Sequence, residues 1–239
     1  MNNKTESFKC PFCGYEGSLE WMSADRSPII QEIQVIGAGR RVGRCPKCKS
    51  KDRERLVYAF LKEKVQEDRL KNARILHIAP EPNIQKWLQS ISPNYIAGDA
   101  FLQNQEFIGE VKYMDISDTP FKDNQFDFVI CNHVICDIKD DKKAAGEIYR
   151  ILDHDGLAIL QVPISKMIST VEYTNVQSKE DREKAYGYAY HERIYGNKDY
   201  INLLKGVGFH VEVHNYYEEF ISYGINKKED LYICVKDHI

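Results

Sequence analysis

The sequence predicts an α/β fold, with a mostly parallel sheet of seven strands preceded by a small cysteine-rich module. Two features lead to this prediction. Four short apolar runs each end on polar or acidic residues, at positions 74–82, 94–99, 111–115 and 126–133. Such runs are typical of parallel strands that helices cover on both faces. Two Cys-x-x-Cys pairs precede them, at positions 10–13 and 45–48.

Composition limits the classes of protein to consider. The chain has 239 residues, 43% hydrophobic and 29% charged, which is enough for one α/β core and a small extra module. A net charge of -3 gives no overall attraction to nucleic acid or to an anionic membrane. The sequence has no apolar run of the ~18 residues that a transmembrane helix needs. Residues 1–6 show no signal-peptide pattern, so we expect a cytoplasmic protein.

The two cysteine pairs predict a metal site formed by Cys10, Cys13, Cys45 and Cys48. Four thiolates on two tight turns are a ligand set that tetrahedral zinc takes in structural sites. The odd total of seven cysteines, in a chain without an export pattern, argues against a disulfide framework. We therefore predict a structural zinc ion in a zinc-ribbon-like module over residues 1–51. A redox role for the two motifs is the alternative.

One stretch of the chain is strongly basic. Residues 40–55 contain eight basic residues and two acids. One interpretation is a solvated face whose charges offset those of the thiolates. The other is a contact for an anionic substrate or partner.

The remaining elements complete a Rossmann-like sheet in a main domain over residues 74–239, joined to the module by a linker over 52–73. We expect the linker to begin with a helix over 52–70 that Asp52 caps. We expect further helices at 83–90, 140–152 and 199–205, a fifth strand at 157–162, and a final antiparallel hairpin from 209–213 and 231–235. Gly156 should end the helix before it in a left-handed conformation. Residues 29–36 should form a strand, with Gly37 and Gly39 at turns.

Residues 164–197 are expected to form a lid. They show no core pattern but concentrate tyrosines and charges, among them His191, Arg193 and Tyr195. A loop this long inside a compact domain is usually functional. It also follows a strand whose carboxyl end borders the expected ligand crevice. Simple packing over the crevice is the alternative.

The crevice is expected where the strands end, because ligands of open α/β sheets bind there. Glu81, Asp99, Asp115 and His133 should converge on it. Asp99 is placed to accept hydrogen bonds from a ribose diol, and Asp115 to bind the amine of an adenine. Residues 79–82 lack the glycines that a pyrophosphate needs. S-adenosylmethionine (SAM) has ribose, adenine and cationic groups that suit Glu81, but no phosphate. Ordinary strand-end acids are the alternative.

Several motifs resemble those of the class I SAM-dependent methyltransferases of the type 11 family. They are Phe-Lys-Asp-Asn-Gln-Phe-Asp at 121–127, Cys-Asn-His-Val-Ile at 131–135, and the helix and turn at 147–156. Residues 45–55, 76–81 and 191–200 resemble motifs of a subgroup with an N-terminal zinc-ribbon-like module. The resemblance covers nearly the whole chain. It departs from the family at Cys136 and Asp137, where Glu-His is usual, and at Gly156, where two glycines are common.

The resemblance implies a SAM-dependent methyltransferase with SAM and a structural zinc ion. The cofactor contacts that it implies are His77, Ala79, Pro80, Glu81, Asp99, Ala100, Asp115, Ile116 and Asn132. Transfer to a hydroxyl group needs a base, and histidine suits this near pH 7. His133 and His191 are therefore the catalytic candidates, and Arg193 and Tyr195 are expected to bind the acceptor.

Three functions remain open at this stage. The favoured one is methyl transfer to oxygen or nitrogen of a small-molecule or saccharide acceptor. The second is a nucleic-acid or protein methyltransferase that docks its target through the basic zinc module, although the net charge argues against nucleic acid. The third is a non-catalytic binding module, in which Ala79 and Pro80 mark a lost cofactor site. The sequence does not indicate the oligomeric state.

Overall fold

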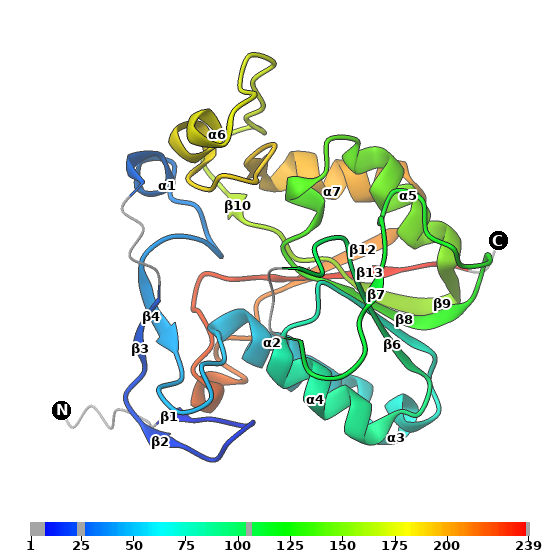
Figure 1. Ribbon diagram of the computed structural model, residues 1–239. Helices are drawn as coiled ribbons and strands as arrows, with labels where there is room; N and C mark the ends of the chain where they lie inside the picture. The colour runs from blue at the N-terminus through cyan, green and yellow to red at the C-terminus, as the bar shows by residue number, and fades with distance from the viewer. Residues whose placement is uncertain (1–7, 23–26, 104–106, 238–239) are drawn as a thin grey trace.

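The computed structural model describes residues 8–22, 27–103 and 107–237, and it confirms the predicted fold class. A seven-stranded sheet runs in the order β12-β13-β9-β8-β5-β6-β7 (Figure 1). β13 pairs antiparallel with both β12 and β9, whereas the pairs from β9 to β7 are parallel. The expected closing hairpin is therefore present, and the sheet is Rossmann-like.

The strands lie where the apolar runs predicted them. Their bounds are β5 Ile75–Ile78, β6 Tyr95–Asp99, β7 Lys112–Tyr113, β8 Phe126–Cys131, β9 Leu152–Ile159, β12 His210–His214 and β13 Leu231–Val235. Only β9 differs much from its prediction at 157–162. The chain passes directly from a helix into this strand, where Leu152 pairs with Phe126 before a register shift.

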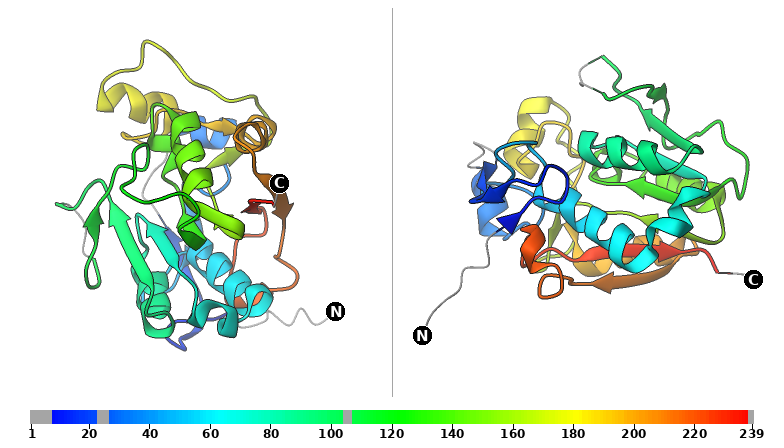
Figure 2. Two further views of the ribbon diagram at one scale, coloured as in Figure 1. Left: turned by 90° about the vertical axis from the view of Figure 1, so that its right-hand side faces the viewer. Right: turned by 90° about the horizontal axis from the view of Figure 1, so that it is seen from below.

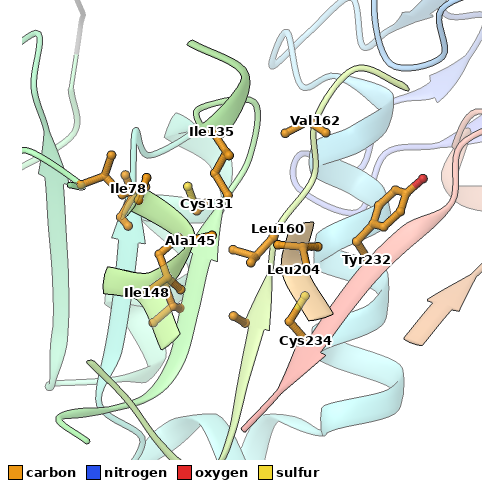
Figure 3. Close-up of a cluster of buried hydrophobic side chains, with 14 of the residues drawn as sticks. Ile78, Cys131, Ile135, Ala145, Ile148, Leu160, Val162, Leu204, Tyr232 and Cys234 are labelled. Carbon is orange, nitrogen blue, oxygen red and sulfur yellow. The ribbon is translucent and has the colours of Figure 1, made fainter. Parts of the chain in front are cut away.

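Helices cover both faces of the sheet (Figure 2). α5 (Asp141–Ile151) and α7 (Asn197–Gly206) pack on one face, and α2 (Asp52–Phe60), α3 (Glu67–Lys71) and α4 (Pro82–Ile91) on the other. Figure 3 shows the first face, where Cys131 and Leu160 of the sheet lie among Ala145, Ile148 and Leu204 of the two helices. Burial on both faces explains why the strands are continuous apolar runs. Within the described ranges, no helix is long and apolar enough to cross a membrane.

The linking helix is interrupted, which the sequence did not predict. Residues 52–70 divide into α2, a π-helical turn (Leu61–Val65) and α3, with a break at Gln66, whose φ is +71°. Lys51 occupies the N-cap position, and Asp52 is the first helical residue. The Asp52 carboxylate instead accepts two hydrogen bonds from Arg41, at 2.6 and 2.9 Å. Apolar residues continue across the break, so periodicity alone did not reveal it.

Two further local predictions were wrong. Gly156 does not adopt a left-handed conformation, whereas Asp155 does, with φ of +59°. The turn is therefore shifted by one residue and lies within β9. Residues 29–36 do not form a strand, because helix α1 (Pro28–Glu32) occupies their first part. Pro28 at the start of α1 favours a helix, since its fixed φ is helical and its missing N–H costs nothing there.

The N-terminal module consists of two hairpins, β1 (Phe8–Lys9) with β2 (Glu16–Gly17) and β3 (Glu20–Met22) with β4 (Arg41–Arg44). Arg55 of α2 attaches it to the main domain. Its buried guanidinium donates to the carbonyls of Ser50 and Gly43 in the module, at 2.6 and 2.8 Å. It also donates to the carbonyls of Tyr223 and Gly224, both at 2.7 Å, at the 3₁₀ turn Ile221–Tyr223. The module is therefore built into the fold.

Residues 164–197 contain two short strands, β10 (Ile164–Ser165) and β11 (Tyr195–Gly196), and helix α6 (Lys179–Tyr186). α6 lies beside α1 of the N-terminal module (Figure 1). Ile30 and Val35 of the module form one apolar cluster with Tyr186 and Ile194. The module and the predicted lid segment therefore pack together as one cap.

Candidate active site

The carboxyl ends of β5 and β8 meet at the buried carboxylate of Glu81, the N-cap residue of α4. Its oxygens lie 2.9 Å from His77 Nε2 and 3.3 Å from Asn132 Nδ2. The His77 tautomer that donates to Glu81 can accept from the Tyr95 hydroxyl at Nδ1, 3.0 Å away. Burial alone would raise the pKa of Glu81, but the hydrogen bond from His77 and the charge of Arg53 outweigh this effect and hold the pKa below its ordinary value. The carboxylate is therefore anionic and suits a cationic ligand group.

The turn before Glu81 has an unusual backbone. Ala79 adopts φ of +49°, a left-handed conformation that costs a residue with a Cβ atom roughly 1–2 kcal/mol. Its N–H donates to the Gly98 carbonyl at 2.8 Å, which ties the turn to β6. The turn is thus held in a glycine-like conformation without glycine, and buried Pro80 follows it.

The buried carboxylate of Asp99 lies at the end of β6. Its Oδ1 accepts from the Phe101 N–H at 2.7 Å. Its Oδ2 is buried and has no hydrogen-bond partner among the described residues. Burial raises the pKa of Asp99 above its ordinary value. An unpaired buried acceptor at this position fits a hydroxyl-bearing ligand, because a donated hydrogen bond would remove the cost of desolvation.

Asp115 follows β7, one strand further along the sheet, and is exposed. Its Oδ1 accepts from the Ser117 N–H at 2.8 Å. Of the residues beside the two acids, Ala100 is exposed and Ile116 is buried. Ile116 packs in the apolar core of the sheet, so the accessible group here is the Asp115 carboxylate, which can accept a hydrogen bond from an exocyclic amine.

A second set of buried polar atoms lacks hydrogen-bond partners in the described parts of the chain. These atoms are Asn132 Oδ1, His133 Nε2, Gln161 Oε1 and Nε2, and Glu229 Oε2. They come from the segments that follow β8 and β9 and precede β13. A Cβ atom at Gly37 would lie 3.4 Å from His133 Cε1 and 3.5 Å from Glu229 Oε1. The N-terminal module therefore approaches this group closely, and glycine leaves room for both side chains.

Sequence reasoning identified Asn132 and His133 in this set but missed Gln161 and Glu229. Gln161 is a polar residue within the apolar run at 157–162, which could have marked it. Glu229 lies in the connection before β13, without a recognisable motif. Burial raises the pKa of Glu229 to about 7, with a further rise from the charge of Asp52. Burial and the charge of Arg53 hold the pKa of His133 well below its ordinary value.

Residues 164–197 follow β9 and reach the loop after β6. The Tyr190 ring lies 6.2 Å from that of Phe101, which follows Asp99. His191 Nε2 lies 3.7 Å from Asp137 Oδ1, and Cys136 Sγ lies 3.3 Å from the same oxygen. Burial lowers the pKa of His191 to about 4, opposed weakly by the Tyr186 backbone. His191 is therefore neutral at pH 7.

Arg193 and Tyr195, expected to bind the acceptor, are engaged with protein groups. The buried Arg193 guanidinium donates to the carbonyls of Ile138 and Lys139 and to the Glu172 carboxylate, over 2.5–3.1 Å. The Tyr195 hydroxyl donates to Asp141 Oδ2 at 2.6 Å. These contacts join residues 172–195 to the start of α5 and occupy both side chains in the structure.

Replacing Arg193 should therefore act first on stability. We expect Arg193→Ala to lower the free energy of unfolding by about 1.5–3 kcal/mol or more, the range for one hydrogen bond to a charged group. Chemical denaturation would measure this, with Lys184→Ala on exposed α6 as the control. If Arg193→Ala keeps the stability of the native protein but binds the acceptor more weakly, Arg193 is a residue of the acceptor site.

The four cysteines of the N-terminal module form one cluster. Their sulfur atoms all lie within 4.8 Å of one another; Cys10 and Cys48 are 3.5 Å apart, and Cys13 and Cys45 3.7 Å. Tetrahedral ligands at the usual Zn–S length of about 2.3 Å would be separated by about 3.8 Å. The Ser50 hydroxyl lies 3.6 and 3.3 Å from the sulfurs of Cys10 and Cys48. The arrangement is compatible with a structural zinc ion.

Several residues of the basic stretch make contacts within the protein. Arg41 pairs with Asp52, and Arg55 holds the module as described above. Arg44 and Lys49 both pair with Glu20, at 3.3 and 3.2 Å.

Comparison with known proteins finds a family resemblance in the middle of the chain. Residues 85–160 match the family model described as a methyltransferase domain. The matched segment includes Asp99, Asp115, Asn132 and His133. This part of the chain is therefore similar to a methyltransferase domain. This match supports SAM as the methyl donor. The residues present fit SAM, since Asp99 Oδ2 has no hydrogen-bond partner among the described residues and Glu81 offers an anionic group.

Three solved structures illustrate what the chain is similar to, and of these the one with a TM-score above 0.5 supports the fold. The [4+2]-cyclase SpnF shares 12% identity, with 88% of this chain and 92% of that chain covered and a TM-score of 0.56. A putative methyltransferase from Bacillus halodurans shares 20% identity, with 69% of each chain covered and a TM-score of 0.45. A putative methyltransferase in complex with the Haloferax volcanii activator Trm112 shares 15% identity over 78% and 94%, with a TM-score of 0.46. No curated protein matches the sequence.

Proposed function

We propose that the protein transfers the methyl group of SAM to oxygen or nitrogen of a small-molecule or saccharide acceptor. The observation that carries this proposal is the set of unpartnered buried polar atoms after β6, β8 and β9 and before β13, in the described structure. Buried polar atoms are rarely left unpaired in native proteins unless something else satisfies them. SAM supplies a methyl group already activated on a sulfonium, so the protein has mainly to align the acceptor with it.

On the cofactor side, we assign Asp99 to the ribose hydroxyls, Asp115 to the adenine amine and Glu81 to the cationic end of SAM. The buried Oδ2 of Asp99 and the lowered pKa of Glu81 support these roles. The further proposed contacts are His77, Ala79, Pro80, Ala100, Ile116 and Asn132.

On the acceptor side, we assign His133, Gln161 and Glu229. The Gln161 amide offers a donor and an acceptor, both buried without a partner in the described chain. A saccharide hydroxyl both donates and accepts, so it suits this mixture of groups. Glu229 is our candidate for the base, because its pKa of about 7 matches the operating range of a general base. The neutral His133 ring would orient the acceptor. His191, close to Asp137, is the second candidate base.

We also propose that Cys10, Cys13, Cys45 and Cys48 hold zinc and that this zinc is structural. All four positions are cysteine, and structural zinc sites are closed by four protein ligands whereas catalytic sites keep one position open. The Ser50 hydroxyl beside two of the sulfurs supports this role, because outer hydrogen bonds orient metal ligands.

Calorimetry with SAM tests the proposed function at Asp99. Asp99→Ala should weaken SAM binding roughly 10- to 100-fold, as expected for loss of a hydrogen bond to a charged group in a buried site. Asp118→Ala, in an exposed acid near Asp115, is the control and should bind SAM normally. Unchanged affinity of Asp99→Ala would mean that the nucleoside lies elsewhere.

The acceptor class can be tested separately. A macromolecular target docked by the basic module would show a steep loss of affinity with salt, whereas a small polar acceptor would not. The internal contacts of Arg41, Arg44, Lys49 and Arg55 favour the small acceptor. Screening with labelled SAM against fractionated cell extract would show whether the labelled product is small.

A further inference from the structure

Among the arginines of the basic stretch, the Arg44 side chain is 42% exposed, whereas Arg41, Arg53 and Arg55 are mostly buried. Arg53 differs from Arg41 and Arg55 in its contacts. Its side chain is only 17% exposed, and its Nε is buried without a hydrogen-bond partner among the described residues. Its one close ionic contact there is with Glu81, whose Oε1 lies 3.6 Å from Nε. Arg41 and Arg55, by contrast, use their guanidinium groups in hydrogen bonds to protein. Arg53 therefore has donors left for a ligand.

The surroundings of Arg53 favour an anionic ligand group. Glu81 is already shared with His77 and Asn132, so it satisfies Arg53 incompletely. Lys51 is half-buried nearby, and the charge of Arg53, followed by burial, lowers the pKa of Lys51. The charges of Glu54 and Glu81 offset part of the repulsion between these two cations, and an anionic ligand group would offset more of it.

The order of the strands indicates which anion this is. The proposed adenine and ribose contacts, Asp115 and Asp99, follow β7 and β6. The next strand in the sheet is β5, followed by Glu81 and its neighbour Arg53. If the adenosine part of SAM lies across the ends of β7 and β6, its methionine part therefore points toward Glu81 and Arg53. That end carries an ammonium and a carboxylate, the charges opposite to those of Glu81 and Arg53.

We propose that Arg53 binds the carboxylate of SAM and that the N-terminal module thereby completes the cofactor site. Arg53 lies on the first turn of α2, five residues after Cys48. The module and the start of α2 are held together by Arg55. The cysteine cluster therefore fixes the segment that presents Arg53 to the crevice. This inference rests on the proposed use of SAM.

Decarboxylated SAM tests the inference because it keeps the sulfonium and the ammonium and lacks only the carboxylate. By calorimetry, the native protein should bind decarboxylated SAM roughly 10- to 100-fold more weakly than SAM, the factor expected for one hydrogen bond between charged groups. Arg53→Gln should bind SAM as weakly as the native protein binds the decarboxylated analogue. It should bind the two compounds about equally.

Lys49→Gln provides a matched control, because Lys49 is a basic residue of the same stretch that pairs with exposed Glu20. It should preserve the preference for SAM. Equal affinity of the native protein for the two compounds would overturn the inference, and this arm needs no variant to fold. A preference that survives in Arg53→Gln would also overturn it. Failure of the native protein to bind either compound would overturn the proposed cofactor, and the role of Arg53 with it.

Discussion

Glu229→Gln is expected to lower turnover roughly 10²- to 10⁴-fold, the usual contribution of a general base. Glu229 is buried, its Oε2 has no partner in the described chain, and it shares the space beside Gly37 with His133. Burial raises its pKa to about 7, so the native protein should lose activity as the pH falls below about 7 and the carboxylate is protonated. Glutamine keeps the shape but cannot accept the proton.

The same substitution should stabilise the fold at high pH. Because burial raises the pKa of Glu229 above its ordinary value of 4.5, ionisation is harder in the folded protein than in the unfolded chain. The native protein therefore loses stability as the pH rises from about 4.5 through about 7, and the loss then levels off. Glu229→Gln cannot ionise, so it should unfold at a higher temperature than the native protein at pH 8.

Thermal unfolding at pH 5 and pH 8, with turnover measured in parallel, checks both expectations. Glu218→Gln, an exposed acid in the same connection, should change neither quantity. A gain in stability combined with a loss of turnover would mark a residue kept for function at the expense of the fold. Turnover within about twofold of native would exclude Glu229 as the base and leave His133 and His191 to be tested.

The sequence predicted the sheet well because the signal for each strand lies in the residues of that strand. Each parallel strand is an apolar run that two helical layers bury, so the run itself shows where the strand lies. Asp99 and Asp115 were predicted for the same reason, since they follow two of these runs directly. The clustering of the four cysteines was predicted because ligand type and spacing carry the information.

The parts that were missed depend on contacts between distant segments. Glu229 and Gly37 lie close together in space, but nothing in either local sequence indicates the other. The sequence placed Arg53 in the basic stretch and Arg193 in the expected lid, and neither local sequence shows which groups surround the side chain. The fold surrounds Arg193 with carbonyl and carboxylate groups, whereas it leaves the Nε of Arg53 without a hydrogen-bond partner among the described residues. The interrupted linking helix was missed because its apolar residues continue through the break.

Loss of the predicted zinc site is expected to unfold the N-terminal module and open the crevice. The module has a small apolar core, with Phe8, Cys10 and Cys45 as its buried members. Structural zinc contributes roughly 10–16 kcal/mol of apparent binding free energy in small zinc-finger peptides, far more than such a core supplies. Cys45→Ser removes one ligand, so the module should lose both the ion and its order.

Unfolding of the N-terminal module should also affect the main domain, because Arg55 joins the two. Two of its hydrogen bonds go to the Ser50 and Gly43 carbonyls of the module, and they would be lost with the module. The guanidinium would then remain partly unpaired at the base of α2, and Gly37 and the cap formed with the lid would no longer close over Glu229. SAM binding should therefore weaken together with zinc loss.

Elemental analysis should find about one zinc ion per native chain and little in Cys45→Ser. Limited trypsin digestion should cut the variant between residues 40 and 55, where the basic residues lie, and leave the native protein intact there. Cys131→Ser is the matched control, because Cys131 is equally buried but lies in β8 outside the cluster; it should keep its zinc. A metal-free native protein with four titratable thiols and the same digestion pattern would show that packing alone orders the module.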